Sequence, residues 1–186
     1  MKDAFELDAS RVVDPCAGAG VWCQAARTTW PDSFVHAIEP REEETRHLER
    51  NADAFSIADF LKAEVSAGAY DIALTNPPFS LFEEIAEESL RVADFACLYA
   101  PIDLLLRAEG RVGWLREHEK HVRALFITPG PIGFRGPGTS TDFRTYGLWV
   151  LHQEARAPMW STLVLPLLPS SSRQWVTRPG TFEVTP

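Results

Sequence analysis

Short apolar runs alternate along the chain with segments that have helical spacing. The run at 71–74 is bounded by polar residues and has the length of a buried strand. The predicted strands lie at residues 12–13, 34–39, 56–61, 71–74, 95–101, 122–129 and 146–151. Strands that alternate with helices in this way predict an α/β protein with a doubly wound sheet.

One predicted helix directly follows the strand at 71–74. Ser80 and Glu83 have the spacing of a capping box, in which each side chain bonds the backbone at the start of a helix. A helix is therefore predicted to begin at Ser80. Its apolar positions recur at helical spacing and would be buried on one face: Phe82, Ile85, Ala86 and Leu90.

A glycine-bearing turn follows the first predicted strand and precedes a helix-like segment that ends near Trp30. Glycines in such a strand, turn and helix let a ligand approach backbone N–H groups closely. The candidate cofactor-binding residues of this turn are Asp14, Pro15, Cys16, Ala17, Gly18 and Gly20. A tight turn without a ligand is the alternative.

Acidic residues end the next two predicted strands. Glu39 lies about 20 residues beyond the glycine turn, where an acid can accept hydrogen bonds from ribose hydroxyls, and Pro40 stops its strand. Asp59 stands near the end of the third strand, with Phe60 beside it. An acid at that position is also typical of a helix cap.

The sequence Asn76-Pro77-Pro78-Phe79 follows the strand at 71–74. The two prolines fix φ and remove two backbone donors, which leaves the carbonyls of Asn76 and Pro77 to act as acceptors. Together with the Asn76 side-chain oxygen and the flat Phe79 ring, they suit a planar group that carries an amine, such as an extruded base. A rigid turn without chemistry is the alternative.

Asn-Pro-Pro-Phe after a strand, with Asp-Pro-x-x-Gly-x-Gly upstream, resembles the motifs of S-adenosylmethionine-dependent DNA adenine-N6 methyltransferases. The resemblance covers roughly residues 12–151. It implies a Rossmann-like methyltransferase fold whose sheet has seven strands, mostly parallel, with the last strand antiparallel. The implied enzyme is a site-specific, adenine-specific DNA methyltransferase.

The resemblance also implies roles for the candidate residues. S-adenosylmethionine would be the cofactor, with its methionine part wrapped by the glycine turn and its adenine held by Asp59 and Phe60. Pro40 and Asn76 would contact it as well. For catalysis, Asn76 and the Pro77 carbonyl would hold the amino group of the target adenine beside Pro78, while Phe79 stacks on the base.

A long loop rich in proline and glycine is predicted at 129–144, between the last two strands. Its candidate substrate-binding residues are Phe134, Arg135, Thr139 and Arg144, since arginines can meet phosphates and a ring can stack on a base. The segment resembles the Phe-x-Gly-x-Gly-Thr and Tyr-x-x-Trp segment of short phage-type adenine methyltransferases. An ordinary hairpin crossing is the alternative.

The net charge of -8 argues against tight autonomous DNA binding, because Lys and Arg supply most non-specific affinity for phosphates. The charge is uneven, however, and Arg and Lys outnumber the acids in the stretch 107–144. A local basic loop could therefore still receive nucleic acid, with DNA as the expected partner.

Other features narrow the function class. No segment approaches the ~20 apolar residues of a membrane helix, and the acidic start at 1–6 is unlike a signal peptide. We therefore expect a cytoplasmic protein that has no membrane partner. The odd number of cysteines, without a C-x-x-C pair, predicts neither a disulfide framework nor a zinc site. His118 and His121 share a helix face but lack a third ligand nearby, so no metal is expected.

The length of 186 residues predicts one methyltransferase domain at 1–154, with an extension at 155–186 that packs on it. Members of the family usually carry a further cofactor-binding segment before the glycine turn and a target-recognition region, and neither is evident here. Sequence specificity would then be low, or would come from a partner or from the loop after Pro129. The sequence does not indicate the oligomeric state.

Three other functions stay open. An RNA adenine methyltransferase would share the core residues. A protein glutamine methyltransferase also uses an Asn-Pro-Pro motif on a planar amide. A non-catalytic subunit could keep the fold as a binding module.

Overall fold

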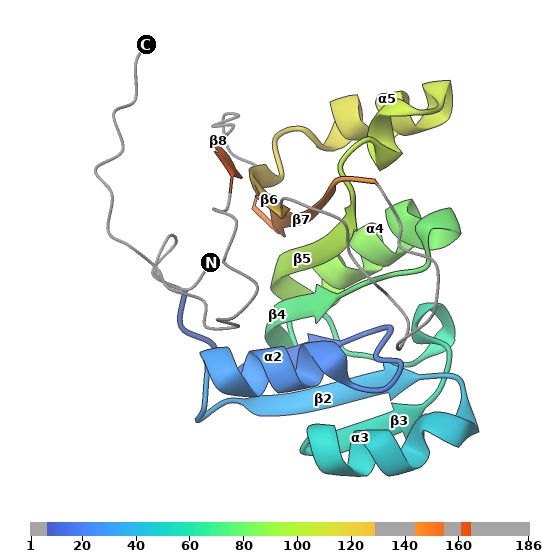
Figure 1. The fold of residues 1–186 in the computed structure, drawn as a ribbon, viewed down its shortest axis with the longest axis vertical. Helices are drawn as coiled ribbons and strands as arrows, with labels where there is room; N and C mark the ends of the chain where they lie inside the picture. Colours follow the sequence, from blue (N-terminus) through green and yellow to red (C-terminus); the bar gives the residue numbers. More distant parts are fainter. Residues whose placement is uncertain (1–6, 129–143, 155–160, 165–186) are drawn as a thin grey trace.

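The computed structural model describes residues 7–128, 144–154 and 161–164. Within these ranges one sheet has the strand order β3-β2-β1-β4-β5-β7-β6-β8 (Figure 1). The strands are β1 (Arg11–Asp14), β2 (Phe34–Glu39), β3 (Ala54–Ile57), β4 (Tyr70–Thr75), β5 (Ala93–Pro101), β6 (Val122–Thr128), β7 (Tyr146–His152) and β8 (Ser161–Val164). The helices are α2 (Val21–Thr29), α3 (Thr45–Asn51), α4 (Phe82–Val92) and α5 (Glu109–His118), and the 3-10 turns are η1 (Glu42–Glu44), η2 (Phe60–Lys62), η3 (Phe79–Leu81) and η4 (Leu104–Leu106).

The pairing of the strands confirms the predicted α/β fold with a mostly parallel sheet. β3, β2, β1, β4 and β5 pair in parallel, and β7 lies antiparallel between β5 and β6. The structure differs from the predicted seven strands by one strand, since β8 pairs in parallel with β6 at the edge. β8 lies within 155–186, and the division of the chain at residue 154 stays a prediction.

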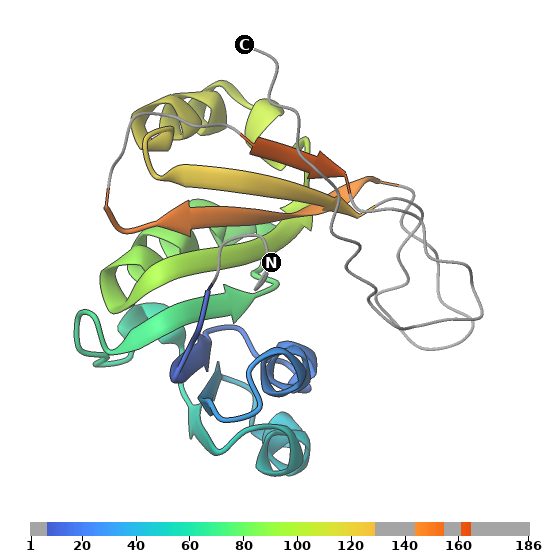
Figure 2. The same ribbon diagram turned by 90° about the vertical axis from the view of Figure 1, so that its left-hand side faces the viewer.

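Apolar side chains alternate between the two faces of the sheet, as the period of two residues in a strand requires. Val13 belongs to the core under α4, whereas its neighbour Val12 belongs to the core under α2. Figure 2 shows α2 and α3 on one side of the sheet and α4 and α5 on the other. The strand ends are therefore left at the edges of a three-layer domain.

The helix after β4 begins two residues later than predicted. η3 closes first, with the Leu81 N–H donating to the Pro78 carbonyl at 2.9 Å, and α4 then begins at Phe82. No side chain caps the start of η3 or of α4 with a hydrogen bond, so the predicted capping box at Ser80 is wrong. The tight turn needed directly after two prolines uses the backbone acceptor instead of the serine hydroxyl.

The third strand was also predicted too far along the chain. β3 ends at Ile57, and residues 60–62 form η2 instead of a strand. Asp59 caps this turn by accepting a hydrogen bond from the Leu61 N–H at 3.1 Å.

In the described residues, no helix is long and apolar enough to cross a membrane, and no group of three His, Cys, Asp or Glu side chains could hold a metal ion.

Candidate active site

The predicted site residues gather at the carboxyl ends of neighbouring parallel strands. β1 ends at Asp14, β2 ends at Glu39, and β4 ends just before Asn76. Since β1 pairs with both β2 and β4 in parallel, these ends lie along one edge of the sheet. In open α/β sheets this edge is where ligands bind.

The glycine turn has the backbone conformation that its residues predict. Gly18 and Gly20 have φ values of 51° and 79°, which lie in the left-handed region that residues with a side chain rarely adopt. A Cβ on Gly20 would lie 2.8 Å from the Cβ of Asn51 in α3. Asn51 also donates from Nδ2 to the Ala19 carbonyl at 2.8 Å, and Gln24 donates to its Oδ1 at 2.7 Å. These contacts fix the shape of the turn from outside, and the sequence did not point to Asn51.

Asp14 lies beneath the turn, with 1% of its surface exposed. It accepts hydrogen bonds from the Cys16 N–H at 3.3 Å and from the Cys23 thiol at 3.8 Å. Burial raises the pKa of Asp14 from 3.8 to about 7, although these hydrogen bonds oppose the shift. Pro15 and Ala17 are buried beside it, while Cys16 and Gly18 are half-buried. Asp14 therefore supports the turn, and the backbone of the turn forms its outer surface.

Glu39 is 4% exposed, and both of its carboxylate oxygens have partners. Oε2 accepts from the Gly18 N–H at 2.7 Å, which joins the β2 end to the glycine turn. Oε1 accepts from Nε of Arg41 at 2.6 Å. Oε1 also accepts from the Arg41 backbone N–H at 3.2 Å. Oε2 accepts one hydrogen bond and has room for a second, so Glu39 still fits the predicted acceptor of ribose hydroxyls. Pro40, which follows it, is exposed.

The segment after β3 differs from its expected arrangement. The Phe60 ring lies in the hydrophobic core with 2% exposure, so it offers little surface to a ligand. Asp59 is exposed and pairs with Lys62 at 2.9 Å, which lowers its pKa. The apolar surface at this point comes instead from Ile57 and Leu61, which are 37% and 36% exposed. Contacts of Asp59 and Phe60 with a cofactor stay predictions.

The backbone carbonyls that follow β4 differ in whether they accept a hydrogen bond within the protein. The Pro78 carbonyl accepts from Leu81, and the Phe79 carbonyl accepts from Nη2 of Arg111 at 2.7 Å. Among the described loops and turns, no backbone N–H donates to the Pro77 carbonyl. The Asn76 Oδ1 atom is buried, and no described residue donates a hydrogen bond to it. A buried acceptor without a donor is unusual in a folded protein.

The half-buried Phe79 ring stands beside other flat groups. Its centroid lies 6.1 Å from that of Tyr146 in β7, and Tyr146 stacks on Tyr99 of β5 at 5.6 Å. The guanidinium carbon of Arg144 lies 5.8 Å from the Phe79 centroid. The structure thus brings Arg144 to the motif, while Tyr146 and Arg111 are neighbours that the site prediction missed.

The other predicted substrate-binding residues, Phe134, Arg135 and Thr139, lie outside the described residues. Several described arginines of the basic stretch contact groups of the protein itself. Arg107 pairs with Asp103, Arg111 pairs with Glu83, and Arg123 donates to backbone carbonyls. A basic loop that receives nucleic acid stays a prediction.

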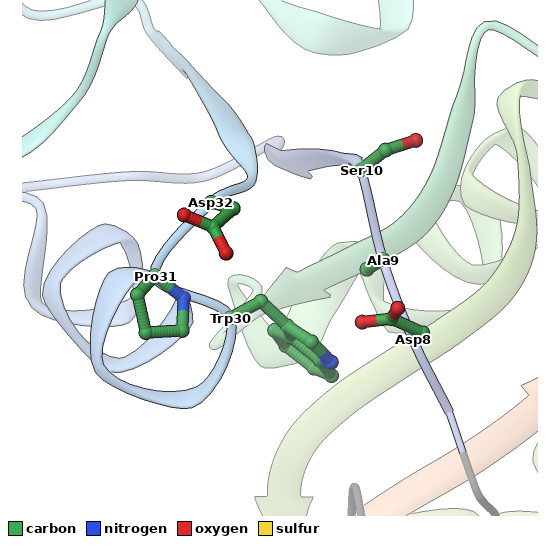
Figure 3. A pocket seen from close by; sticks show the side chains of 6 residues that line it. All are labelled: Asp8, Ala9, Ser10, Trp30, Pro31 and Asp32. Atoms are coloured by element: carbon green, nitrogen blue, oxygen red, sulfur yellow. The ribbon is translucent and has the colours of Figure 1, made fainter.

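A cavity of about 160 Å³ lies at the opposite edge of the sheet, before β1 and after α2. Figure 3 shows Asp8 and Asp32 on the two segments that border it, with Trp30 between them. None of the predicted site residues lines this cavity. The candidate site is instead an open edge where side chains and carbonyls meet.

No protein-family profile and no curated protein matches the chain. Solved structures do resemble it. A candidate RNA methyltransferase from Pyrococcus horikoshii matches with a TM-score of 0.63 and 18% identity, over 81% of this chain and 77% of that chain. A modification subunit of a candidate type I restriction enzyme from Vibrio vulnificus matches with a TM-score of 0.61 and 14% identity, over 94% of this chain but 46% of that subunit.

A third similar structure is a 16S rRNA N2 methyltransferase from T. thermophilus in complex with AdoMet and guanosine. Its TM-score is 0.52 at 17% identity, over 81% of this chain and 36% of that chain. At these identities the likeness establishes the fold. The chain therefore has the Rossmann-like fold of the methyltransferases.

Proposed function

We propose that the protein is an S-adenosylmethionine-dependent methyltransferase that modifies the exocyclic amino group of adenine in DNA. The observation that carries this proposal is the buried Asn76 Oδ1, which lacks a donor among the described residues. An acceptor left in this state costs about 1–3 kcal/mol. The amino group of a substrate would satisfy it at the strand end where ligands bind in this fold.

The residues around the glycine turn fit S-adenosylmethionine. Gly18 and Gly20 hold the left-handed backbone of the turn, and Glu39 stands beside it as an acceptor for ribose hydroxyls. Ile57 and Leu61 offer exposed apolar surface to an adenine ring. A bound cofactor would supply an electrophilic methyl group on a sulfonium, with the S–C bond breaking as the N–C bond forms and the sulfur leaving as a neutral thioether. The AdoMet in the similar T. thermophilus structure supports the same assignment.

Asn76 and Pro77 would prepare the nucleophile. Asn76 Oδ1 and the Pro77 carbonyl accept the two N–H hydrogens of the adenine amino group, which draws the nitrogen toward tetrahedral geometry and exposes its lone pair. The nitrogen can lose its proton to water after it has been methylated. The motif therefore acts by positioning and dipole alignment, and needs no strong base.

Phe79 would hold the extruded base by stacking. Tyr146 packs against one part of its ring, and Arg144 lies over it. A cation at this place could meet a phosphate next to the extruded nucleotide. Phe134, Arg135 and Thr139 would extend this contact along the loop.

RNA is the second candidate substrate, because two of the similar structures carry names that specify RNA. A panel of DNA, RNA and glutamine-containing peptides, incubated with labelled S-adenosylmethionine, separates the candidates. The proposal expects label on adenine N6 in DNA. Label on RNA alone, or on a glutamine amide, would identify that molecule as the substrate instead of DNA. A folded protein preparation that labels none of them would overturn the enzymatic assignment.

Asn76→Ala is the variant that tests the site itself. Removal of the acceptor should lower turnover by about 100- to 1,000-fold, while calorimetry shows nearly unchanged binding of S-adenosylmethionine. Ser80→Ala is the matched control, because Ser80 is exposed, lies in the adjoining turn and makes no cap bond. Full turnover by the Asn76 variant would contradict the proposed role.

A further inference from the structure

Arg111 connects α5 to the motif after β4. Its Nη2 donates to the Phe79 carbonyl at 2.7 Å, and its Nε lies 2.9 Å from Oε1 of Glu83 in α4. The two side chains are 24% and 19% exposed, so solvent screens this ion pair only in part. One guanidinium thus joins the motif, the helix that follows it and a helix about 30 residues further along the chain.

With this contact, two backbone carbonyls of the motif accept hydrogen bonds from within the protein. The Pro78 carbonyl is taken by the Leu81 N–H, and the Phe79 carbonyl is taken by Arg111. Backbone carbonyls are strong acceptors, so each one left open near the site would compete for an amino group. With these two engaged, the acceptors of the motif that have no donor among the described residues are Asn76 Oδ1 and the backbone carbonyls of Asn76 and Pro77.

The charge of Arg111 needs a counter-charge at this place. A sulfonium donor is cationic, and a nitrogen that accepts a methyl group gains positive charge before it loses its proton. A bare guanidinium nearby would oppose both charges. Glu83 pairs with the guanidinium, so Arg111 can donate its hydrogen bond with little net charge.

We propose that Arg111 is a positioning residue that selects the acceptors of the motif, with Glu83 as its counter-charge. This inference rests on the proposed function, because it assigns a role to Arg111 within the same site. Arg111 acts through Phe79 and does not touch the substrate.

The test compares Arg111→Ala with Arg107→Ala. Arg107 is the matched control, since it pairs with Asp103 and stands four residues earlier without a described contact to the motif. Arg111→Ala should lower kcat by about 100-fold, the cost of a small misplacement of reacting groups. Its Kd for S-adenosylmethionine should stay within about twofold of the control.

Hydrogen–deuterium exchange gives a readout that does not depend on turnover. The amides of residues 79–82 should exchange faster in Arg111→Ala than in Arg107→Ala, because the turn closed by Pro78 and Leu81 loses its outer support. Equal exchange and equal kcat in the two variants would overturn the inference. If Arg111→Ala does not fold, Arg111→Lys serves in its place, because a single ammonium cannot reproduce both fork contacts, and wild-type kcat in that variant would also overturn it.

Glu83→Gln tests the counter-charge. It keeps the arginine but leaves its charge unbalanced, so kcat should fall at low salt and recover as added salt screens the charge. A kcat that stays unchanged at every salt concentration would refute this part. Failure of Asn76→Ala to lower turnover would refute the proposed function, whereas the exchange comparison at residues 79–82 reports on Arg111 alone.

Discussion

In the half of the site built from β1, β2 and β3, the buried polar side chains at the strand ends already have partners within the protein. Asp14 accepts from Cys16 and Cys23, and Glu39 accepts from Gly18 and Arg41. In the half built from β4, the buried Asn76 Oδ1 has no donor among the described residues. The two halves lie on one edge of the same sheet.

The two ligands of the proposed reaction would therefore be received differently. Internal hydrogen bonds hold the glycine turn in shape, so that half is organised before a cofactor arrives, which reduces the entropy lost on binding. In the Asn76 half, the side-chain oxygen has no donor among the described residues, and the folded state bears the free-energy cost of this unpaired acceptor. Preorganised groups aimed at a reacting atom are the main means by which enzymes lower barriers.

The largest effect is expected where the preorganised half is disrupted. Gly20→Ala places a side chain in a left-handed conformation and 2.8 Å from the Asn51 Cβ. The conformation costs about 1–2 kcal/mol and the clash a further ~1–3 kcal/mol of unfolding free energy. Calorimetry should also show weaker binding of S-adenosylmethionine, because a displaced Asn51 releases the Ala19 carbonyl. Chemical denaturation measures the stability change.

Gly68→Ala is the control for this substitution. Gly68 has a φ of 62° and no atom within 4 Å of the added Cβ, so it shares the strain but lacks the clash. Gly68→Ala should lose only the conformational cost of about 1–2 kcal/mol in unfolding free energy, and it should bind S-adenosylmethionine as the wild type does. Equal losses of stability in the two variants would show that Asn51 does not hold the turn.

The next effect concerns the pH dependence of stability. Burial raises the pKa of Asp14 to about 7 in the folded state, while the unfolded chain has the ordinary value of 3.8. Between these values the folded protein holds a proton that the unfolded chain has released, so this group makes stability fall as pH rises. The slope from one such group is about 1.4 kcal/mol per pH unit.

Asp14→Asn removes this group and should remove its share of the slope. Denaturation curves of the wild type and the variant between pH 4 and pH 7 measure the difference, in which the contributions of other groups cancel. The stability of the variant relative to the wild type should rise with pH across that window. A constant difference would mean that Asp14 is ionised throughout and not buried as described.

The strand ends could be predicted because their signals are local. The apolar run before Asn76 and the glycines after Asp14 each mark a strand that stops at a turn, and parallel pairing then places them on one edge. Asp59 could be read either as a ligand or as a cap, and only the structure shows that it caps η2.

Contacts between distant segments could not be predicted in this way. Arg111 reaches Phe79, and Asn51 reaches Ala19, each across about 30 residues of chain. No periodicity or motif links such residues, because the contact arises only when helices pack on the sheet. The burial of the Phe60 ring could not be predicted for the same reason, because it depends on how the surrounding core residues pack.

The smallest effect compares the same residue type in the two halves. Asn51 uses both ends of its amide, whereas the Asn76 oxygen lacks a donor among the described residues. Asn51→Ala should therefore lower the free energy of unfolding by about 1–2 kcal/mol, and Asn76→Ala should change it by less than ~0.5 kcal/mol or raise it slightly. Denaturation midpoints at one pH measure both. A loss on Asn76→Ala as large as that on Asn51→Ala would mean that the Asn76 amide is satisfied inside the folded chain, and its oxygen would then not be held in reserve for a substrate. An unchanged or raised stability, together with lost turnover, is the combination expected of an acceptor kept for function at a cost to the fold.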